Sequence, residues 1–334
     1  MIRILCRIAQ NTAMIELPPE QLPAALKVKG NLLWVDLACE DGEVSATYQP
    51  LLTDTFGFHP LAVEDALVET HQPKIDDWDE YIYLVLYAVD FDKAQLDVDS
   101  HEVDVFVGPN YVVTHHTERV NAIERLRSIC QRDARRLQRG ADYLLYELAD
   151  AIVADFMPCL DELDETANEL EDEVFNNPTR ETLVRIFTLK RAAIHLRRIL
   201  SPQREVLNRL ARDEYRVIDA KERIYFRGVY DHLVRLHDIN EGLRDLISGA
   251  LDIYLSAVSN RLNEVMRILT LVTVLGLPLT FLTGFFGMNF FGASYEIPAP
   301  LGGNVLFLIA MLAMIFTPLV VYVLLKQYVR RRKL

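Results

Sequence analysis

Two long apolar segments lie in the C-terminal third of the chain. Residues 268–286 are 19 uncharged and mostly apolar positions, and residues 305–325 are 21 more. Each segment is long enough to cross a hydrocarbon core of about 30 Å as a helix. One such segment alone would also fit a buried core helix. Two in succession, joined by a short loop, indicate a pair of transmembrane helices.

The first 140 residues have a different pattern. Residues 31–39, 81–89 and 103–116 show alternation or short apolar runs bounded by Gly, Pro, Asp and Asn, which is typical of strands. Residues 59–69 read as a short helix with Pro60 near its first turn. We therefore expect an α/β domain over residues 1–140, with His115 and His116 at a strand end and on the surface.

From Tyr143 the apolar positions follow helical spacing, with Pro158 as a predicted kink. Residues 147–179 hold 11 acidic and no basic residues, whereas residues 180–212 hold nine basic residues and two Glu. An Asn-Asn-Pro turn at residues 176–178 separates them. Residues 141–218 are thus predicted as a helical hairpin. Its charges either attract the two arms or form two solvated faces.

No proline occurs between Pro202 and Pro278, and residues 219–277 read as one helix of 59 residues. Such a helix is about 90 Å long. We expect a stalk that continues into the first transmembrane helix, over residues 219–287. An outer loop (288–304), a second transmembrane helix (305–325) and a basic tail (326–334) follow.

A stripe of mostly polar or small residues runs along this predicted helix. Its members are separated by alternating steps of four and three, a repeat of 3.5 residues that is typical of one seam of a left-handed helix assembly. We call these positions the polar stripe: Asp252, Ser256, Ser259, Asn263, Met266, Thr270, Thr273, Leu277, Thr280, Gly284 and Gly287.

Inside a lipid bilayer, the polar stripe must face protein or water. Small and polar residues can hold two helices together. Alternatively, several copies of the helix surround a water-filled path, which requires a homo-oligomer. Asp252 and Asn263 favour the path, because helix packing has little use for an acid there. Met266 and Leu277 would then be apolar constrictions.

Charge gives the orientation and narrows the function. The tail carries five Lys or Arg residues and residues 287–304 carry none, so both termini are expected in the cytoplasm of a multi-pass protein of the cytoplasmic membrane. The four cysteines form no CxxC pair, which suits a reducing compartment. A net charge of −13 argues against a nucleic-acid partner. Nothing indicates an enzyme or a required cofactor.

The oxygen atoms of the polar stripe suit a cation. In the outer loop Glu296 is the only acid, and Asn289 offers a neutral carbonyl. Because Mg²⁺ gives up its waters reluctantly, a ring of such carbonyls suits the hydrated ion. A potential that is negative inside favours entry of a divalent cation by about 4.6 kcal/mol per 100 mV.

Several motifs resemble the CorA-type magnesium and cobalt channels. Residues 284–290, Gly-Phe-Phe-Gly-Met-Asn-Phe, resemble the Gly-Met-Asn signature of that family. Residues 56–67, 71–76 and 259–270 are also similar to it, as is the order of α/β domain, stalk and two C-terminal spans. The resemblance covers essentially the whole chain.

The resemblance implies a homopentamer with a cytoplasmic funnel, in which the long helix lines the pore. It makes Gly287, Met288 and Asn289 the selectivity signature, with Asn289 at the outer mouth. In the family, cytoplasmic Mg²⁺ can close the channel by bridging acids of neighbouring subunits. Asp92 resembles the funnel acid, but its stalk counterpart falls at Gly228. We hypothesise that Asp231 substitutes and that this regulatory site is weakened or shifted.

The expected function is therefore a channel for Mg²⁺, and with it Co²⁺ and Ni²⁺, driven by the membrane potential and gated by intracellular Mg²⁺. A zinc transporter of the same superfamily, proton-coupled or not, is the first alternative. A non-conducting membrane sensor or scaffold, in which the polar stripe only holds helices together, is the second.

Overall fold

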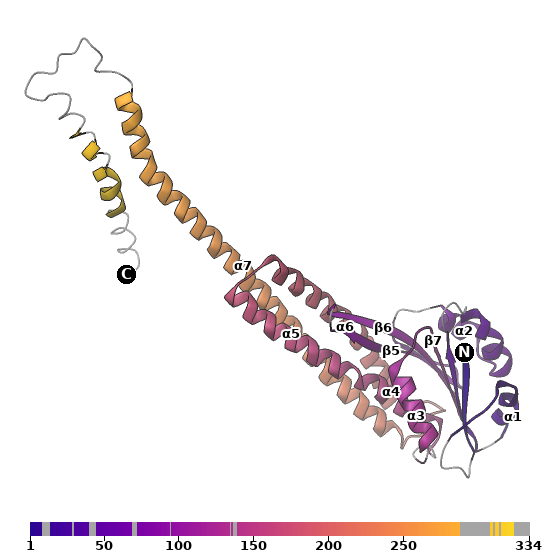
Figure 1. Ribbon diagram of the computed structural model, residues 1–334. Coiled ribbons are helices and arrows are strands. Elements are labelled where there is room, and N and C mark those ends of the chain that lie inside the picture. Colours follow the sequence, from indigo (N-terminus) through magenta and orange to yellow (C-terminus); the bar gives the residue numbers. More distant parts are fainter. Residues whose placement is uncertain are drawn as a thin grey trace, which may run out of the picture. The chain divides into compact units, whose positions relative to one another are not determined.

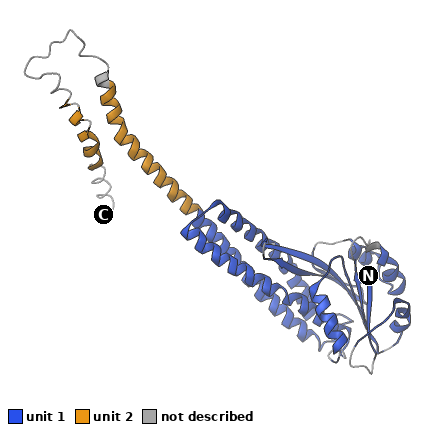
Figure 2. Ribbon diagram, in the orientation of Figure 1, with its two compact units in different colours: residues 1–254 blue, residues 255–334 orange. Residues whose placement is uncertain are grey.

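The computed structural model describes residues 1–8, 14–28, 30–39, 45–68, 72–93, 95–133, 135, 139–287, 308–309, 311–313 and 315–323. The chain divides into two units, Met1–Tyr254 and Leu255–Leu334 (Figure 2). The first unit holds the sheet and most of the helices, and each unit is treated separately below.

A seven-stranded sheet forms the centre of the first unit, in the order β2-β1-β3-β7-β6-β5-β4. Only β3 and β7 pair in parallel, and the other neighbours are antiparallel. The strands are β1 (Ile2–Arg7), β2 (Ile15–Glu16), β3 (Leu32–Ala38), β4 (Lys74–Asp77), β5 (Ile82–Asp92), β6 (Asp97–Val107) and β7 (Tyr111–His116).

The three predicted β segments are confirmed as β3, β5 and the β6–β7 hairpin. The sequence pattern did not single out β1, β2 and β4. Two of these, β2 and β4, are the short edges of the sheet, with two and four residues, and so carry little periodic signal.

Helices cover both faces of the sheet (Figure 1). On one side lie α1 (Leu22–Leu26) and α2 (Pro60–Leu67), near the short helical turns Pro19–Gln21, Ser45–Tyr48 and Leu51–Thr55. On the other side lie α3 (Asn121–Arg132) and α4 (Ala141–Ala154), and α4 contacts β5, β6 and β7. The predicted short helix with Pro60 in its first turn is confirmed as α2, whose first turn is capped by His59 Nδ1, which accepts from Leu61 N–H at 3.2 Å.

The predicted hairpin is formed by α5 (Phe156–Asn176) and α6 (Arg180–Arg212). A break at Asp155 separates α4 from α5, so Pro158 lies in the first turn of α5, where its missing N–H costs no helical hydrogen bond. Thr179 begins α6 with a reciprocal pair of hydrogen bonds to Thr182.

Apolar packing holds the hairpin together more than charge does. Both helices bury apolar side chains, among them Leu163 and Leu170 of α5 and Leu189 and Leu196 of α6. Within these two helices, which are fully described, the ion pairs that join the arms all involve Arg185, at 2.7 Å from Glu173 and 3.8 Å from Glu169. Most charges of both arms therefore form solvated faces, the second of the two interpretations.

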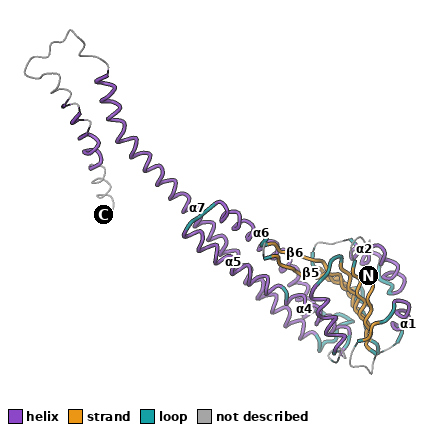
Figure 3. The backbone as a smooth tube through the Cα atoms, in the orientation of Figure 1, coloured by secondary structure: helices purple, strands orange, loops and turns teal. Residues whose placement is uncertain are grey.

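The long helix α7 (Arg223–Gly287) is continuous over 65 residues (Figure 3). It begins four residues later than expected and passes through Pro278. Within the first unit it buries one seam, spaced in alternating steps of three and four: Phe226, Val229, Leu233, Leu236, Asn240, Leu243, Ile247, Ala250 and Tyr254. We call these positions the buried seam.

The buried seam is fixed by contacts with α4 and α6. The ring of Phe226 meets that of Tyr146 edge-on, with centroids 6.3 Å apart. Asn240, the polar member, donates from Nδ2 to the carbonyl of Ala193 at 3.1 Å. These contacts decide which face of α7 the first unit covers, and leave the opposite face outside.

The expectation of surface positions for His115 and His116 is wrong: both are buried, at 1% and 2% exposure. Neighbouring strand residues point to opposite faces, and helices cover both faces of this sheet, so both imidazoles are enclosed. His116 Nε2 lies 3.1 Å from Asp36, and His115 Nδ1 lies 3.2 Å from Asp104.

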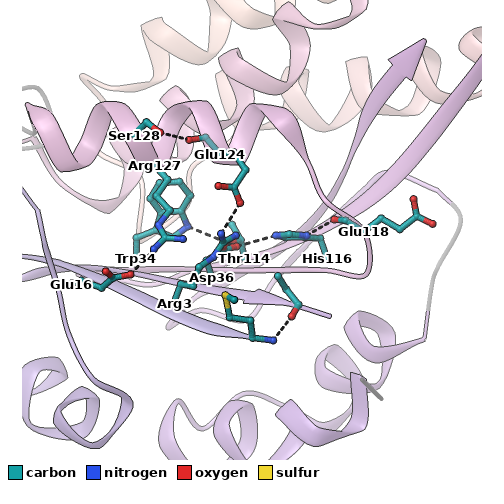
Figure 4. Close-up of polar contacts among 12 residues, drawn as sticks. Arg3, Glu16, Trp34, Asp36, Thr114, His116, Glu118, Glu124, Arg127 and Ser128 are labelled. Carbon is teal, nitrogen blue, oxygen red and sulfur yellow. Dashed lines mark hydrogen bonds and ion pairs between the residues drawn. The ribbon is translucent and has the colours of Figure 1, made fainter. Parts of the chain in front are cut away.

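Asp36 is the centre of a buried polar network (Figure 4). Its carboxylate accepts from Arg3 Nη2 at 2.6 Å and from Thr114 Oγ1 at 2.7 Å, in addition to His116. Burial alone would raise the pKa of Asp36, but His116, Arg3 and Thr114 together outweigh it and hold that pKa below its usual value. The network joins β1, β3 and β7 by a paired charge.

Candidate ion path

The polar stripe lies on α7 in the second unit and at the end of the first. Its members from Asp252 to Gly284 are all solvent-exposed in the single chain. So are apolar neighbours such as Leu262 at 62% and Val272 at 63% exposure. Exposure therefore does not separate the faces of this segment. Their chemistry does: one face carries hydroxyl, amide and small groups, and the others carry Leu, Ile, Val and Phe.

Each threonine of the polar stripe donates a hydrogen bond from its hydroxyl group to a backbone carbonyl of α7, four residues earlier. Thr270 Oγ1 donates to the Met266 carbonyl at 2.8 Å, Thr273 to Leu269 at 2.8 Å and Thr280 to Gly276 at 3.1 Å. With the proton used inside the helix, the lone pairs of each oxygen remain for an outside donor or a cation. This face of α7 thus presents acceptors, as a cation or its hydration water needs.

The same spacing continues backward through the first unit. From Asp252 the steps of three and four lead to Gly249, Asp245, Gly242, Asp238, Arg235, Asp231 and Gly228, and every one of these residues is exposed. A Cβ placed on any of the three glycines would meet nothing within 4 Å. The predicted stripe begins at Asp252, although the same count continued backward along the sequence reaches these positions.

Four acids recur on this face at intervals of seven residues: Asp231, Asp238, Asp245 and Asp252. We call them the acid ladder. Successive members are about 10.5 Å apart along the helix. The face lies opposite the buried seam, because Asp252 precedes Tyr254 by two residues, or about 200° around the helix. The chain's own packing therefore turns the acid ladder outward.

The path does not contain a chelating metal site in the parts of the chain that the structure describes. No group of three or more His, Cys, Asp or Glu side chains that could hold a metal ion occurs there. Asp92 ends β5 and Asp231 lies in α7, so the two predicted regulatory acids belong to different elements.

The outer part of the predicted site cannot be placed in the same way. Gly287 is the last residue of α7. Met288, Asn289, Glu296, the rest of the loop 288–304 and the tail 326–334 lie outside the described residues. Their roles stay predictions.

Among the described residues, one helix is long and apolar enough to cross a membrane, at Arg223–Gly284 with a mean hydropathy of 2.0 over its best window. A shorter apolar helix occurs at Met311–Val323, within the predicted second span.

Comparison with known proteins identifies the family. Residues 30–329 match the family described as "CorA-like Mg2+ transporter protein". The chain belongs to the CorA-like Mg²⁺ transporter family. It is 39% identical over 236 residues to the cobalt/magnesium transport protein CorA of Thermotoga maritima, covering 70% of this chain and 67% of that protein.

The CorA fold extends over nearly the whole chain. The complete structure of the CorA magnesium transporter from Methanocaldococcus jannaschii superimposes with a TM-score of 0.80 at 22% identity, covering 96% of both chains. At that identity the match establishes the fold alone. The α/β domain with its long helix is thus the CorA architecture, as expected from the sequence.

The chain is also similar to proteins with other named substrates. The zinc transport protein ZntB of Photorhabdus laumondii is 27% identical over 190 residues, covering 56% of this chain and 57% of that protein. CorA membership therefore indicates divalent cation transport without fixing which cation is carried.

Proposed function

We propose that this chain forms a homopentameric channel that admits Mg²⁺, and with it Co²⁺ and Ni²⁺, through the cytoplasmic membrane. Both termini lie in the cytoplasm, and the membrane potential drives entry. The polar stripe of α7 lines the path, and Asn289 forms a ring of carbonyls at the outer mouth. No bound cofactor is required, because the ion itself is the cargo.

The observation that carries this proposal is the continuous polar face of α7. Ten exposed stripe positions from Asp252 to Gly284 follow one seam of a helix assembly, and three of their threonines turn lone pairs outward. A single helix cannot enclose a path, so several copies must supply it. A water-filled pore is the environment in which such a face avoids the cost of contact with lipid.

The acid ladder extends the same face toward the cytoplasm. In an assembly that brings the α7 helices together along this face, each acid would form a ring of like charges. Such rings attract divalent cations to the inner part of the path and repel anions. Between the last three acids, Gly242 and Gly249 leave room for a hydrated ion, since they place no side chain in the path. Arg235 lies between Asp231 and Asp238 and offsets part of their charge.

The test is divalent cation uptake into liposomes that contain the purified full-length protein, with a Mg²⁺-sensitive dye inside and an imposed inside-negative potential. We expect Mg²⁺ entry that rises with the potential. Asn289→Ala should abolish it, and hexaamminecobalt, a mimic of a hydrated ion, should block it. The control is protein-free liposomes treated in parallel.

The zinc transporter is the alternative that the match to ZntB favours. Zn²⁺ entry that follows a proton gradient, with little Mg²⁺ flux, would support it over the magnesium channel. If protein that is folded and oligomeric carries neither ion, the polar stripe would serve only to hold helices together, as in a sensor or scaffold.

We further propose that intracellular Mg²⁺ gates this channel weakly, through Asp92 and Asp231 of neighbouring subunits. Gly228 offers no ligand, and the exposed Asp231 lies three residues further along α7. The test measures flux against internal Mg²⁺ for wild type and Asp92→Ala. We expect closure in the variant to need more Mg²⁺; an unchanged closing concentration would remove Asp92 from the regulatory site.

A further inference from the structure

One cysteine differs from the other three in its surroundings. Cys6, Cys130 and Cys159 are at most 3% exposed. Burial raises the pKa of the Cys6 thiol, and it raises those of Cys130 and Cys159 to about 12. A protonated, enclosed thiol is a poor nucleophile. Cys39 is only half-buried and lies just after β3.

Cys39 faces an imidazole that is itself held by a carboxylate. Cys39 Sγ lies 3.7 Å from His115 Nε2. On the other side of the ring, His115 Nδ1 lies 3.2 Å from Asp104 Oδ2. The carboxylate accepts the Nδ1 proton, so the lone pair of Nε2 points toward the sulfur. A nucleophile, a base and a group that orients the base are thus in line.

The framework of the sheet keeps these three groups in register. Asp104 of β6 and His115 of β7 are direct partners across the antiparallel ladder. The backbone N–H of Cys39 donates to the carbonyl of His116 at 2.9 Å, which continues the β3–β7 pairing by one residue. Asp104 Oδ1 also accepts from Tyr83 Oη at 2.7 Å. Neither the base nor the carboxylate can turn away without breaking these bonds.

We propose that Cys39 is a reactive thiol, activated by His115 and Asp104, that accepts covalent modification by low-molecular-weight disulfides and electrophiles. In the disulfide reaction, Cys39 Sγ transfers its proton to His115 Nε2 and bonds to one sulfur of the reagent. The reagent's S–S bond breaks, and its second sulfur leaves as a thiolate, which takes the proton from His115. Cys39 is oxidised to a mixed disulfide, and half of the reagent is reduced to a thiol.

The charges near Cys39 are consistent with this role at neutral pH. Burial raises the pKa of Asp104 to about 6, with hydrogen bonds from His115 and Tyr83 acting in the opposite direction and the charge of Glu102 adding to the rise. The carboxylate is therefore ionised at pH 7.5. Among the described residues, the adjoining elements also bring the Met1 ammonium and the hydroxyl of Tyr48, which both contact the carbonyl of Ala38.

The test is the reaction of the full-length protein with 5,5′-dithiobis(2-nitrobenzoic acid) and, separately, with iodoacetamide, followed by peptide mass spectrometry. In the native protein we expect one thiol to react and that thiol to be Cys39. All four should react in denaturant. Cys39→Ser should remove the native signal, while Cys130→Ser should leave it unchanged.

Asp104→Asn and His115→Gln test the activation. The dependence of the alkylation rate on pH gives the pKa of Cys39, and a purely structural role would leave its midpoint unmoved. We expect both variants to shift the midpoint upward and to slow reaction at pH 7 by about tenfold, since each unit of thiol pKa changes the thiolate fraction tenfold. Circular dichroism identifies any variant that fails to fold.

Two results would overturn the proposal. In one, no thiol of the native protein reacts faster than the three buried cysteines. In the other, Cys39 reacts with the same pH midpoint in wild type and in folded Asp104→Asn, as an ordinary exposed thiol would. Because ion flux is not measured, either result is independent of the channel function proposed above.

Discussion

Two regions of this protein are rich in polar side chains: one buries them, and the other leaves them exposed. On the sheet, Asp36, Asp104, His115 and His116 are at most 3% exposed, and each has a partner within the chain. On α7, the acid ladder and the polar stripe from Asp252 to Gly284 are exposed, and the fold of the single chain does not cover them. The first region completes its own network. The second offers its polar groups to water, an ion or another subunit.

The difference shows what each region is for. A buried charge costs several kcal/mol unless it is paired, so the polar groups of the sheet serve the fold that binds them. A polar face within an apolar segment gains nothing for the fold of one chain. Its regular spacing over more than 50 residues of α7 therefore calls for an explanation outside the single chain.

The largest effect is expected from blocking the polar stripe. Thr273→Cys, in a Cys39→Ser background, should make Mg²⁺ flux sensitive to a cationic methanethiosulfonate reagent. Modification of the introduced cysteine should block the path and abolish Mg²⁺ entry. Val272→Cys is the matched control, because it lies one residue away on an apolar face and is 63% exposed. Equal inhibition of both variants would contradict a path along the stripe.

A large loss of stability is expected from breaking the Asp36 network. Asp36→Ala leaves His116 and Arg3 without their carboxylate and should cost about 3–5 kcal/mol. Ser259→Ala on the polar stripe should change stability by less than about 0.5 kcal/mol. Calorimetry of the full-length protein in detergent checks both, each through the unfolding transition of the unit that holds the substituted residue. Equal effects would mean that the two polar regions do not differ as the contacts indicate.

The raised pKa of Asp104 should make the free energy of unfolding depend on pH. Its pKa is raised to about 6 in the folded state and lies near 3.9 when unfolded. The native state therefore binds its proton more tightly, and its contribution to stability is lost as pH rises from about 4 to 6. Unfolding of wild type and Asp104→Asn, compared at pH 4.5 and 7, should show a gap that changes with pH. A constant gap would contradict the raised pKa.

The smallest effect is expected on Mg²⁺ flux, from neutralising two residues of the acid ladder. Asp238→Asn with Asp245→Asn should lower Mg²⁺ flux about twofold at low ionic strength, and the difference should fade at high salt. Glu171→Gln with Asp172→Asn removes the same charge from α5 and should leave flux unchanged. If both double variants lower Mg²⁺ flux equally, the flux depends on the net charge of the protein and not on the acid ladder.

Sequence patterns predicted most of the fold where one element carries a long, regular signal. The three β segments, α2, the α5–α6 hairpin and the continuous α7 all appear near their expected positions. The pattern did not reveal β1, β2 and β4, of which β2 and β4 are too short for periodicity. It also misplaced His115 and His116, because alternation along a strand does not say whether one or both faces of the sheet are covered.

The candidate site was predictable in part for a related reason. The polar stripe is a regular repeat, so counting positions found it from Asp252 onward, and the acid ladder was within reach of the same count. The arrangement of Cys39, His115 and Asp104 was not predictable from the sequence. Asp104 and His115 lie on β6 and β7 and Cys39 lies just after β3, and only pairing of β3 with β7 and of β7 with β6 brings them together.

The sequence by itself determined the apolar segments, the 3.5-residue repeat of α7 and the CorA motifs, because each is a local or periodic property of the chain. The tertiary structure alone decided which face of α7 is buried and which is left open. A repeat of 3.5 residues fits a buried seam and an open face equally well. Packing against α4 and α6 selects the apolar seam from Phe226 to Tyr254, and geometry then turns the acids of the opposite face outward.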